Sequence, residues 1–293
     1  MEHAEVIALV TAHARALGLA CTPRVIADRS NLVLALEPHA LVARVAMATS
    51  TARVGLAWLR REVEVSRFLG PALATQPATT LPAGPHELDG LVVSYWRREG
   101  LRDGPIDPRA AGQQLARCHR ALASYPPAAL PLLGAWEEVR GIAARAIASP
   151  LLEAHERAAI EGGLERAERI LEDTPRRSAS MQAVHGDAHL GNVLATERGT
   201  LWTDWEDAFV GPIEHDLACL RSRAELFGEQ REEIEAACAA YDVPHDEALV
   251  RELGHVRNVQ VIVWLAIFAE RQPELAPRLR ARIQKLAPAV RWY

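Results

Sequence analysis

The chain has 293 residues, of which 49% are hydrophobic, enough for a sizeable core in one large domain or two lobes. Its 33 basic and 38 acidic residues give a net charge of −5, which argues against nucleic acid as a partner. The longest apolar run, Val261 to Ala269, is too short to cross a bilayer and predicts a buried helix rather than a membrane anchor.

The start of the chain and its cysteines bear on where the protein resides. Residues from Glu2 onward carry no basic-then-apolar leader, so we do not expect secretion. The cysteines lie far apart and form no Cys-x-x-Cys pair, which predicts reduced thiols in a cytoplasmic protein. Nothing in the sequence indicates an oligomeric state.

The first fifty residues mix helix and strand patterns. Apolar residues at helical spacing predict a helix over residues 2–17, ending at Gly18. Two apolar runs, 32–36 and 40–47, flank Glu37-Pro38-His39 and predict a hairpin.

The next fifty residues repeat this mixture. Ser50 or Thr51 is expected to begin a helix that runs to about Leu69. A second hairpin is predicted over residues 86–88 and 91–96, because Asp89-Gly90 is a favoured two-residue turn.

After Gly100 the pattern becomes helical. Asp107-Pro108 is typical of a helix start, with Asp as the N-cap and Pro in the first turn. In this part of the chain only residues 193–204 look β-like. Further helices are expected over residues 134–147, 152–173, 214–227, 230–240, 246–269 and 274–287.

Two short segments, 185–192 and 203–207, carry the most chemical information. Asp187 and Asn192 lie on one Gly-containing loop, and Asp204 follows a short apolar run that predicts a strand. Phosphoryl transfer needs a carboxylate to orient the attacking hydroxyl, and carboxylate and amide oxygens to hold Mg²⁺ against nucleotide phosphates. The three side chains supply those groups.

These motifs resemble the aminoglycoside phosphotransferase and choline kinase-like family, whose signature is His-Gly-Asp, four variable residues, Asn, and an Asp-Trp or Asp-Phe strand end. Carried over by position, Asp187 resembles the catalytic base, and Asn192 and Asp204 resemble the Mg²⁺ ligands. His185 resembles the structural histidine of the loop. Asp216 is similar to the acid that buttresses the loop from the following helix.

The resemblance implies an α+β, two-lobed, protein kinase-like fold. We expect a small N-terminal lobe over residues 1–96, with an antiparallel sheet and a helix that clamp the nucleotide. A larger, mostly helical lobe over residues 97–293 would carry the catalytic loop and the acceptor site. The implied activity is transfer of the γ-phosphate of ATP or GTP to a hydroxyl of an antibiotic, such as an aminoglycoside, or of a metabolite.

Arg44 is the only charge in the apolar run over residues 40–47, and a buried guanidinium needs a partner. Glu62 lies on the apolar stripe of the next helix with Trp58. Their pairing resembles the Lys–Glu ion pair of kinases, which implies that Arg44 contacts the α- and β-phosphates. The alternative is a snorkelling Arg44 on an exposed edge strand, with Glu62 exposed as well.

The remaining nucleotide contacts are expected on two segments. Ser30 and Asn31 lie where kinases have a Gly-rich loop, and a tight turn could offer backbone N–H groups to phosphate although it contains no glycine. A plain turn is the alternative. Ser94, Tyr95 and Trp96 are expected to offer backbone groups to the purine, near a hinge between the lobes.

Candidate acceptor contacts are the carboxylates of Glu206, Asp207 and Glu214, which would suit a cationic group. They do not distinguish an antibiotic from a metabolite, so the acceptor is expected only to be a small hydroxylated molecule.

Two other functions fit parts of the sequence. A non-catalytic kinase-like nucleotide-binding module would be expected to lack one of Asp187, Asn192 and Asp204, and all three are present. The set His185, Asp187 and His189 would suit a metal-dependent hydrolase, although that function wants further ligands at related spacing.

Overall fold

The computed structural model describes residues 2–28, 31–47, 55–178 and 181–286. The chain divides into two compact units. Unit 1 comprises Met1–Asp107 and Val193–Glu206, and unit 2 comprises Pro108–Asn192 and Asp207–Tyr293. The lobe boundary expected at residues 96/97 stays a prediction.

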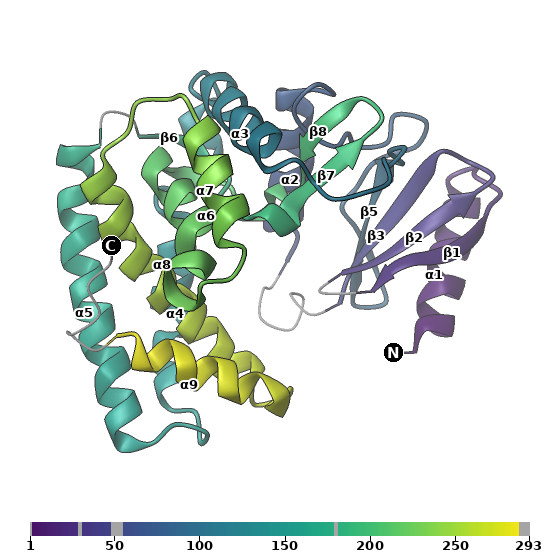
Figure 1. The fold of residues 1–293 in the computed structure, drawn as a ribbon. Helices are drawn as coiled ribbons and strands as arrows, with labels where there is room; N and C mark the ends of the chain where they lie inside the picture. The colour runs from purple at the N-terminus through teal and green to yellow at the C-terminus, as the bar shows by residue number, and fades with distance from the viewer. Residues whose placement is uncertain (1, 29–30, 48–54, 179–180, 287–293) are drawn as a thin grey trace. The chain divides into compact units, whose positions relative to one another are not determined.

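Unit 1 contains a five-stranded antiparallel sheet in the order β1-β2-β3-β5-β4 (Figure 1). Both predicted hairpins are present, and Asp89 and Gly90 turn between β4 and β5 with φ angles of 47° and 79°. The strands are β1 (Thr22–Asp28), β2 (Asn31–Glu37), β3 (Leu41–Ala46), β4 (His86–Leu88) and β5 (Leu91–Arg97).

Strand β1 was not expected from the sequence. Its residues alternate between exposed and half-buried, so it lacks the apolar run of an inner strand, and it pairs only with β2 at one edge of the sheet.

The two faces of the sheet pack against different helices. Helix α1 (His3–Ala16) shares a core with alternate residues of β2 and β3, such as Leu34 and Ala43. Helix α2 (Ala57–Leu69) packs Trp58 against Ala46 on the opposite face. Because successive residues of a strand point to opposite faces, Arg44 lies on the α2 side with Ala46.

The ends of these helices test two expectations. Helix α1 ends just before Gly18, and helix α2 ends at Leu69, as predicted. The expected helix start at Ser50 or Thr51 lies outside the described residues. A further hairpin of unit 1, β7 (Val193–Thr196) and β8 (Gly199–Trp202), confirms the strand expected before Asp204.

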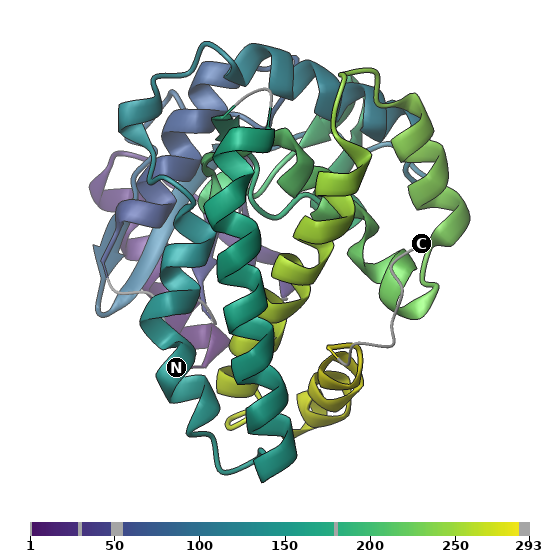
Figure 2. The ribbon, with the colours of Figure 1, turned by 90° about the vertical axis from the view of Figure 1, so that its left-hand side faces the viewer.

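Unit 2 is mostly helical. Helix α8 is buried along much of its length and packs against α4, α5 and α6, and Figure 2 shows it running beside α5. This confirms the buried helix predicted from Val261 to Ala269. The helices are α3 (Pro108–Leu122), α4 (Gly134–Ile147), α5 (Ala154–Arg177), α6 (Ile213–Phe227), α7 (Arg231–Ala240), α8 (Glu247–Phe268) and α9 (Ala276–Gln284).

The expectation that only residues 193–204 are β-like after Gly100 is wrong. Strands β6 (Met181–Val184) and β9 (Phe209–Pro212) also form an antiparallel pair in unit 2. Each has four residues, too few for a clear alternation, and their pairing spans a long stretch of sequence. The pair places the 185–192 loop beside the start of α6. Among the described helices, none is long and apolar enough to span a membrane.

Candidate active site

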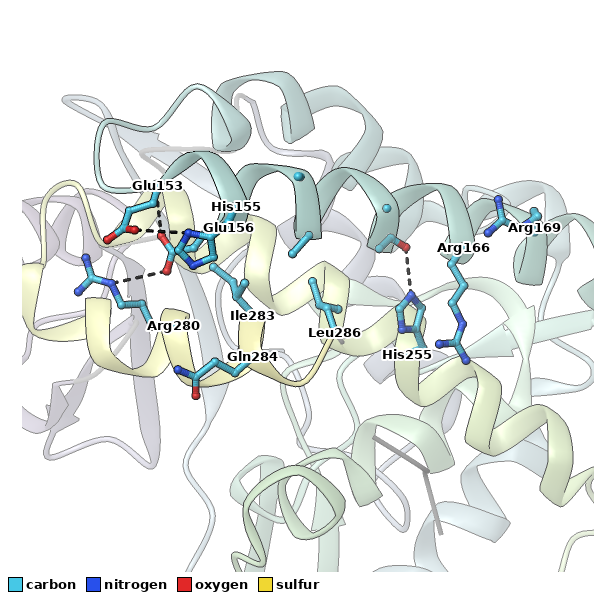
Figure 3. A pocket seen from close by; sticks show the side chains of 14 residues that line it. Glu153, His155, Glu156, Arg166, Arg169, His255, Arg280, Ile283, Gln284 and Leu286 are labelled. Atoms are coloured by element: carbon cyan, nitrogen blue, oxygen red, sulfur yellow. Dashed lines mark hydrogen bonds and ion pairs between the residues drawn. The ribbon is translucent and has the colours of Figure 1, made fainter. Parts of the chain in front are cut away.

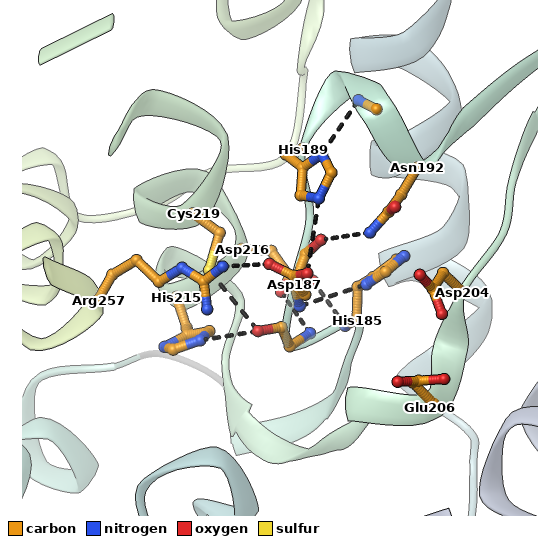
Figure 4. A network of polar contacts seen from close by, with 12 residues as sticks. His185, Asp187, His189, Asn192, Asp204, Glu206, His215, Asp216, Cys219 and Arg257 are labelled. Atoms are coloured by element: carbon orange, nitrogen blue, oxygen red, sulfur yellow. Dashed lines mark hydrogen bonds and ion pairs between the residues drawn. The ribbon is translucent and has the colours of Figure 1, made fainter. Parts of the chain in front are cut away.

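Asp216, in the first turn of α6, anchors the backbone of the 185–192 loop. Its two carboxylate oxygens accept the backbone N–H groups of His185 and Gly186 at 2.7 and 2.8 Å, as Figure 4 shows. His119 Nε2 donates to the same carboxylate at 2.9 Å and in turn accepts from the Tyr241 hydroxyl through Nδ1. These contacts place Asp216 where the family resemblance implies a buttressing acid.

Asp216 is fully buried, and its charge depends on these donors. Burial alone would raise its pKa, but the hydrogen bond from His119 and the favourable electrostatic interaction with that ring hold the pKa below its ordinary value. The group therefore stays an anion at neutral pH and keeps accepting the loop N–H groups.

Gly186 is required by the backbone of this loop. Its φ angle is +86°, and a Cβ at this position would overlap the carbonyl oxygen of Asp207. A side chain between His185 and Asp187 would therefore displace the loop from the segment that follows Asp204.

Asp187 lies on the loop with its side chain partly exposed. Its Oδ1 contacts the guanidinium of Arg257 from α8, and its Oδ2 lies 3.5 Å from His189 Nε2 (Figure 4). Burial alone would raise its pKa, but the charge of Arg257 and the contact with His189 hold the pKa well below its ordinary value. Asp187 is therefore a carboxylate throughout the neutral range.

Asn192 ends the short 3₁₀ turn η3 (Leu190–Asn192) that closes the loop. Its side-chain amide donates to the backbone carbonyl of Asp187 at 3.0 Å. This contact fixes the amide nitrogen toward the loop and turns the amide oxygen away from it, so that the oxygen can serve as a cation ligand.

Three histidines of the site bind backbone groups of the 185–192 loop. His185 Nδ1 accepts from the Asp187 N–H at 3.3 Å, and His189 Nδ1 accepts from Gly191 N–H at 3.0 Å. His215 donates to the Gly186 carbonyl at 3.3 Å, and burial lowers its pKa. The described part of the chain contains no group of three or more His, Cys, Asp or Glu placed to hold a metal. These contacts favour structural roles over the hydrolase interpretation.

Arg44 is the centre of a second cluster, within unit 1. Its guanidinium contacts the carboxylates of Glu62 and Asp204, and that of Glu206 at 2.8 Å. Asn31, with its amide oriented to satisfy both groups, accepts from Arg44 Nε at 3.0 Å. The Arg44 and Glu62 side chains are only 11% and 1% exposed, so the alternative of a snorkelling arginine does not hold.

The charge of Arg44 depends on these carboxylates. Burial alone would lower the pKa of Arg44, but Asp204, Glu62 and Glu206 raise it above its ordinary value. Of the three carboxylates, that of Asp204 is the most exposed, at 28%, against 1% for Glu62 and 7% for Glu206. Carboxylate oxygens are the ligands that a hard divalent cation such as Mg²⁺ prefers.

Asp204 also has an unusual backbone. Its φ angle is +69°, in the left-handed region that non-glycine residues seldom occupy, and it directly precedes the short turn η4 (Trp205–Asp207). Trp205 in that turn is fully buried, so its packing helps to hold the carboxylate in this conformation.

The other expected nucleotide contacts receive less support. Ser30 lies outside the described residues, and Asn31 begins β2. Ser94 is buried and accepts from the Trp96 indole at 2.8 Å. The backbone N–H of Tyr95 donates to the Ala83 carbonyl, and the Tyr95 carbonyl accepts from the backbone N–H of Ala78. The purine contact expected over Ser94–Trp96 stays a prediction.

The expected acceptor carboxylates Glu206 and Glu214 are both buried. Glu206 is buried and pairs with Arg44. Glu214 is 2% exposed and accepts from the backbone N–H of Asp246 at 3.1 Å. Asp207 lies in η4, where its carbonyl faces Gly186. These contacts favour structural roles for Glu206 and Glu214.

A groove of ≈ 820 Å³ also lies in unit 2, against α5 and α9 (Figure 3). Its lining includes His255 and Arg166 but none of the predicted site residues. It is therefore not the candidate active site.

Arg257 is the residue that the sequence analysis missed. The signal was available, because Arg257 is a charge within the largely apolar pattern of α8 and needs a partner for the same reason as Arg44. Its partner could not be named, since Asp187 lies 70 residues away in sequence.

Comparison with known proteins identifies structures of similar fold. Structures similar to this chain include a choline/ethanolamine kinase family protein from Mesorhizobium loti (18% identity, 98% of this chain and 96% of that one, TM-score 0.69) and a microcompartment-associated aminopropanol kinase (17%, 94% and 96%, TM-score 0.72). Another is an amicoumacin kinase in complex with AMP-PNP and Ca²⁺ (14%, 98% and 98%, TM-score 0.67).

At these identities the likeness establishes the fold, and it confirms the expected two-lobed kinase-like class. No protein of curated function matches the sequence. Residues 22–253, most of the chain, match the phosphotransferase enzyme family. The resemblance noted in the sequence is confirmed, and the chain belongs to the phosphotransferase enzyme family.

Proposed function

We propose that this protein is a kinase that transfers the γ-phosphate of ATP or GTP to a hydroxyl group of a small molecule. The observation that carries the proposal is the state of Asp187. It is an ionised, partly exposed carboxylate on a loop that Asp216 anchors through two backbone N–H groups.

Asp187 would accept a hydrogen bond from the acceptor hydroxyl and align it with the γ-phosphorus. A carboxylate with a lowered pKa is a weak base, so orientation rather than early proton removal is the role that suits it. Weak basicity is compatible with the loose transition state of phosphoryl transfer, in which the acceptor proton leaves late.

Asn192 and Asp204 would hold the divalent cation. The outward amide oxygen of Asn192 and the carboxylate-rich surroundings of Asp204 fit the oxygen donors that Mg²⁺ prefers. When bound, Mg²⁺ neutralises negative charge on the phosphate oxygens.

Arg44 would contact the nucleotide phosphates, with Glu62 holding its guanidinium in place. A guanidinium is suited to phosphate because it offers several donors in a planar fork. Asn31, at the start of β2, lies against Arg44 and would shape the same part of the site.

The acceptor would be a hydroxylated antibiotic or metabolite. The printed names of the similar structures span both classes, an antibiotic kinase and an aminopropanol kinase, and support the class of reaction more than one substrate.

The test is a screen of acceptors with γ-labelled ATP and GTP in the presence of Mg²⁺. Each alcohol should be paired with its deoxy analogue, and the Asp187→Asn variant should serve as the control. We expect label transfer to some alcohols, none to the deoxy partners, and a large loss in the variant. Nucleotide binding without transfer to any acceptor would favour the non-catalytic module instead.

A further inference from the structure

The contact between Arg257 and Asp187 has a simple charge balance. One guanidinium from α8 meets one carboxylate on the loop, and the Arg257 side chain is only 14% exposed. Burial alone would lower the pKa of Arg257, but nearby Cys219 and Asp187 hold it above its ordinary value. Both partners are therefore charged at neutral pH.

Stability alone does not explain such a pair. Removing two charges from water is unfavourable, and an apolar pair of similar volume often gives equal or greater stability. The Nε of Arg257 is buried and makes no hydrogen bond within the described residues, so the guanidinium is not even fully satisfied. The pair is better explained by what it does to Asp187.

Arg257 acts on one oxygen of the Asp187 carboxylate. The guanidinium contacts Oδ1, whereas Oδ2 has, among the residues that the structure describes, one long contact of 3.5 Å, to His189 Nε2. Asp216 anchors the loop backbone through His185 and Gly186, but it does not touch the Asp187 side chain. The orientation of the carboxylate thus depends on Arg257.

We propose that Arg257 is a positioning residue for the phosphoryl transfer: by holding Oδ1 of Asp187, it turns Oδ2 toward the acceptor hydroxyl. The inference rests on the proposed function and adds to it a residue outside the recognised motifs. Arg257 itself touches neither acceptor nor nucleotide in this account.

Removing the guanidinium should lower kcat without weakening nucleotide binding. In Arg257→Met, a side chain of similar reach without charge, the Asp187 carboxylate can rotate away from its productive orientation. A misplacement of this kind lowers the rate by about 10- to 100-fold. Arg257→Lys keeps the charge and a donor and should recover part of the loss, while the KM for ATP stays within about 3-fold in both variants.

The decisive experiment is a double-mutant cycle in kcat with Asp187→Asn. If Arg257 acts through the Asp187 carboxylate, Arg257→Met should change the residual kcat of Asp187→Asn by less than about 2-fold. The matched control is Arg282→Met. Arg282 is also buried in unit 2, at 2% exposure, but it donates to Asn258 rather than to the loop. Its replacement should leave kcat within about 3-fold.

The outcomes separate this proposal from the proposed function. An active wild type in which Arg257→Met costs the same factor in both backgrounds, or in which it leaves kcat unchanged, overturns the positioning role alone. An equal loss in Arg282→Met would mean that any buried arginine has the same effect, and would also overturn it. A wild type that transfers no phosphate to any acceptor overturns the proposed function, and this role with it.

Discussion

Each unit contains a buried arginine that meets carboxylates, and the two differ in the number of carboxylates that they contact. In unit 1, Arg44 contacts Glu62, Asp204 and Glu206. In unit 2, Arg257 forms one ion pair within the described residues, with Asp187. Asp204 is 28% exposed, so its carboxylate can also face a bound cation, whereas the contact of Arg257 fixes one side chain. The comparison favours a binding role for the first region and a positioning role for the second.

The largest expected effect on activity comes from Asp187 in unit 2. Asp187→Asn removes the carboxylate that would orient the acceptor, so kcat should fall by about 10²- to 10⁴-fold. The nucleotide affinity should stay within about 3-fold, because Asp187 does not hold phosphate in this account. Steady-state kinetics and calorimetric titration with MgATP check the two parts. Near-normal turnover would remove Asp187 from its role.

A second test concerns the support of the loop. Asp216→Ala leaves two loop N–H groups and His119 without their acceptor, and removing one partner of a buried pair costs about 3–5 kcal/mol in the free energy of unfolding. Urea unfolding measures this loss. Asp173→Ala, which removes an exposed ion pair with Arg176 on α5, should change stability by less than about 1 kcal/mol. Similar losses in the two variants would contradict the buttressing role.

A third test concerns Asp204, the most exposed of the three carboxylates that contact Arg44. Asp204→Asn should weaken Mg²⁺-dependent nucleotide binding by about 100-fold, the upper range for disturbed metal sites. The stability of the ligand-free protein should hardly change, because Arg44 keeps Glu62 and Glu206. Calorimetry and urea unfolding report the two quantities separately. If stability falls while nucleotide binding persists, Asp204 is a structural partner of Arg44 and not a cation ligand.

The last test asks whether water reaches the part of α8 that carries Arg257. His255, one half-turn earlier on α8, is buried and donates to the Gly163 carbonyl at 3.0 Å. Burial lowers its pKa from 6.5 to about 4. The unfolded chain therefore binds a proton more readily than the folded protein in this range, and stability is lost as the pH falls from about 6.5 to about 4.

The expected loss from His255 over this range is about 3 kcal/mol. His255→Gln keeps a donor for Gly163 without a titrating ring, so its unfolding free energy should depend less on pH over that window. His215, whose pKa is also lowered by burial, is present in both proteins and its contribution cancels. Parallel pH profiles for wild type and variant would show that this part of α8 admits water.

Local patterns predicted much of this molecule. Strand alternation and the helical stripe brought Arg44 and Glu62 to one side of the sheet, and the spacing of Asp187, Asn192 and Asp204 identified the reaction class. Most helices of unit 2 begin and end within a few residues of the expected positions, because their apolar faces repeat over several turns.

What could not be predicted depends on contacts between distant segments. Strands β6 and β9 are too short to show a pattern and form only because they pair with each other. The sequence marks Arg257 as a charge that needs a partner but does not say which carboxylate it meets. Glu206 was expected at the acceptor, and the structure pairs it with Arg44, because its neighbour Trp205 is buried and fixes the direction of the turn.

The most direct measurement of the central claim is the ratio of two products. Wild-type protein, Mg²⁺, ATP and an acceptor from the screen should yield ADP and phosphorylated acceptor in equal amounts, measured by chromatography and mass spectrometry of the same samples. ADP without a phosphorylated acceptor, across the whole panel, would mean that the chain hydrolyses nucleotide or only binds it, and the account of Asp187 as the residue that orients an acceptor hydroxyl would be wrong.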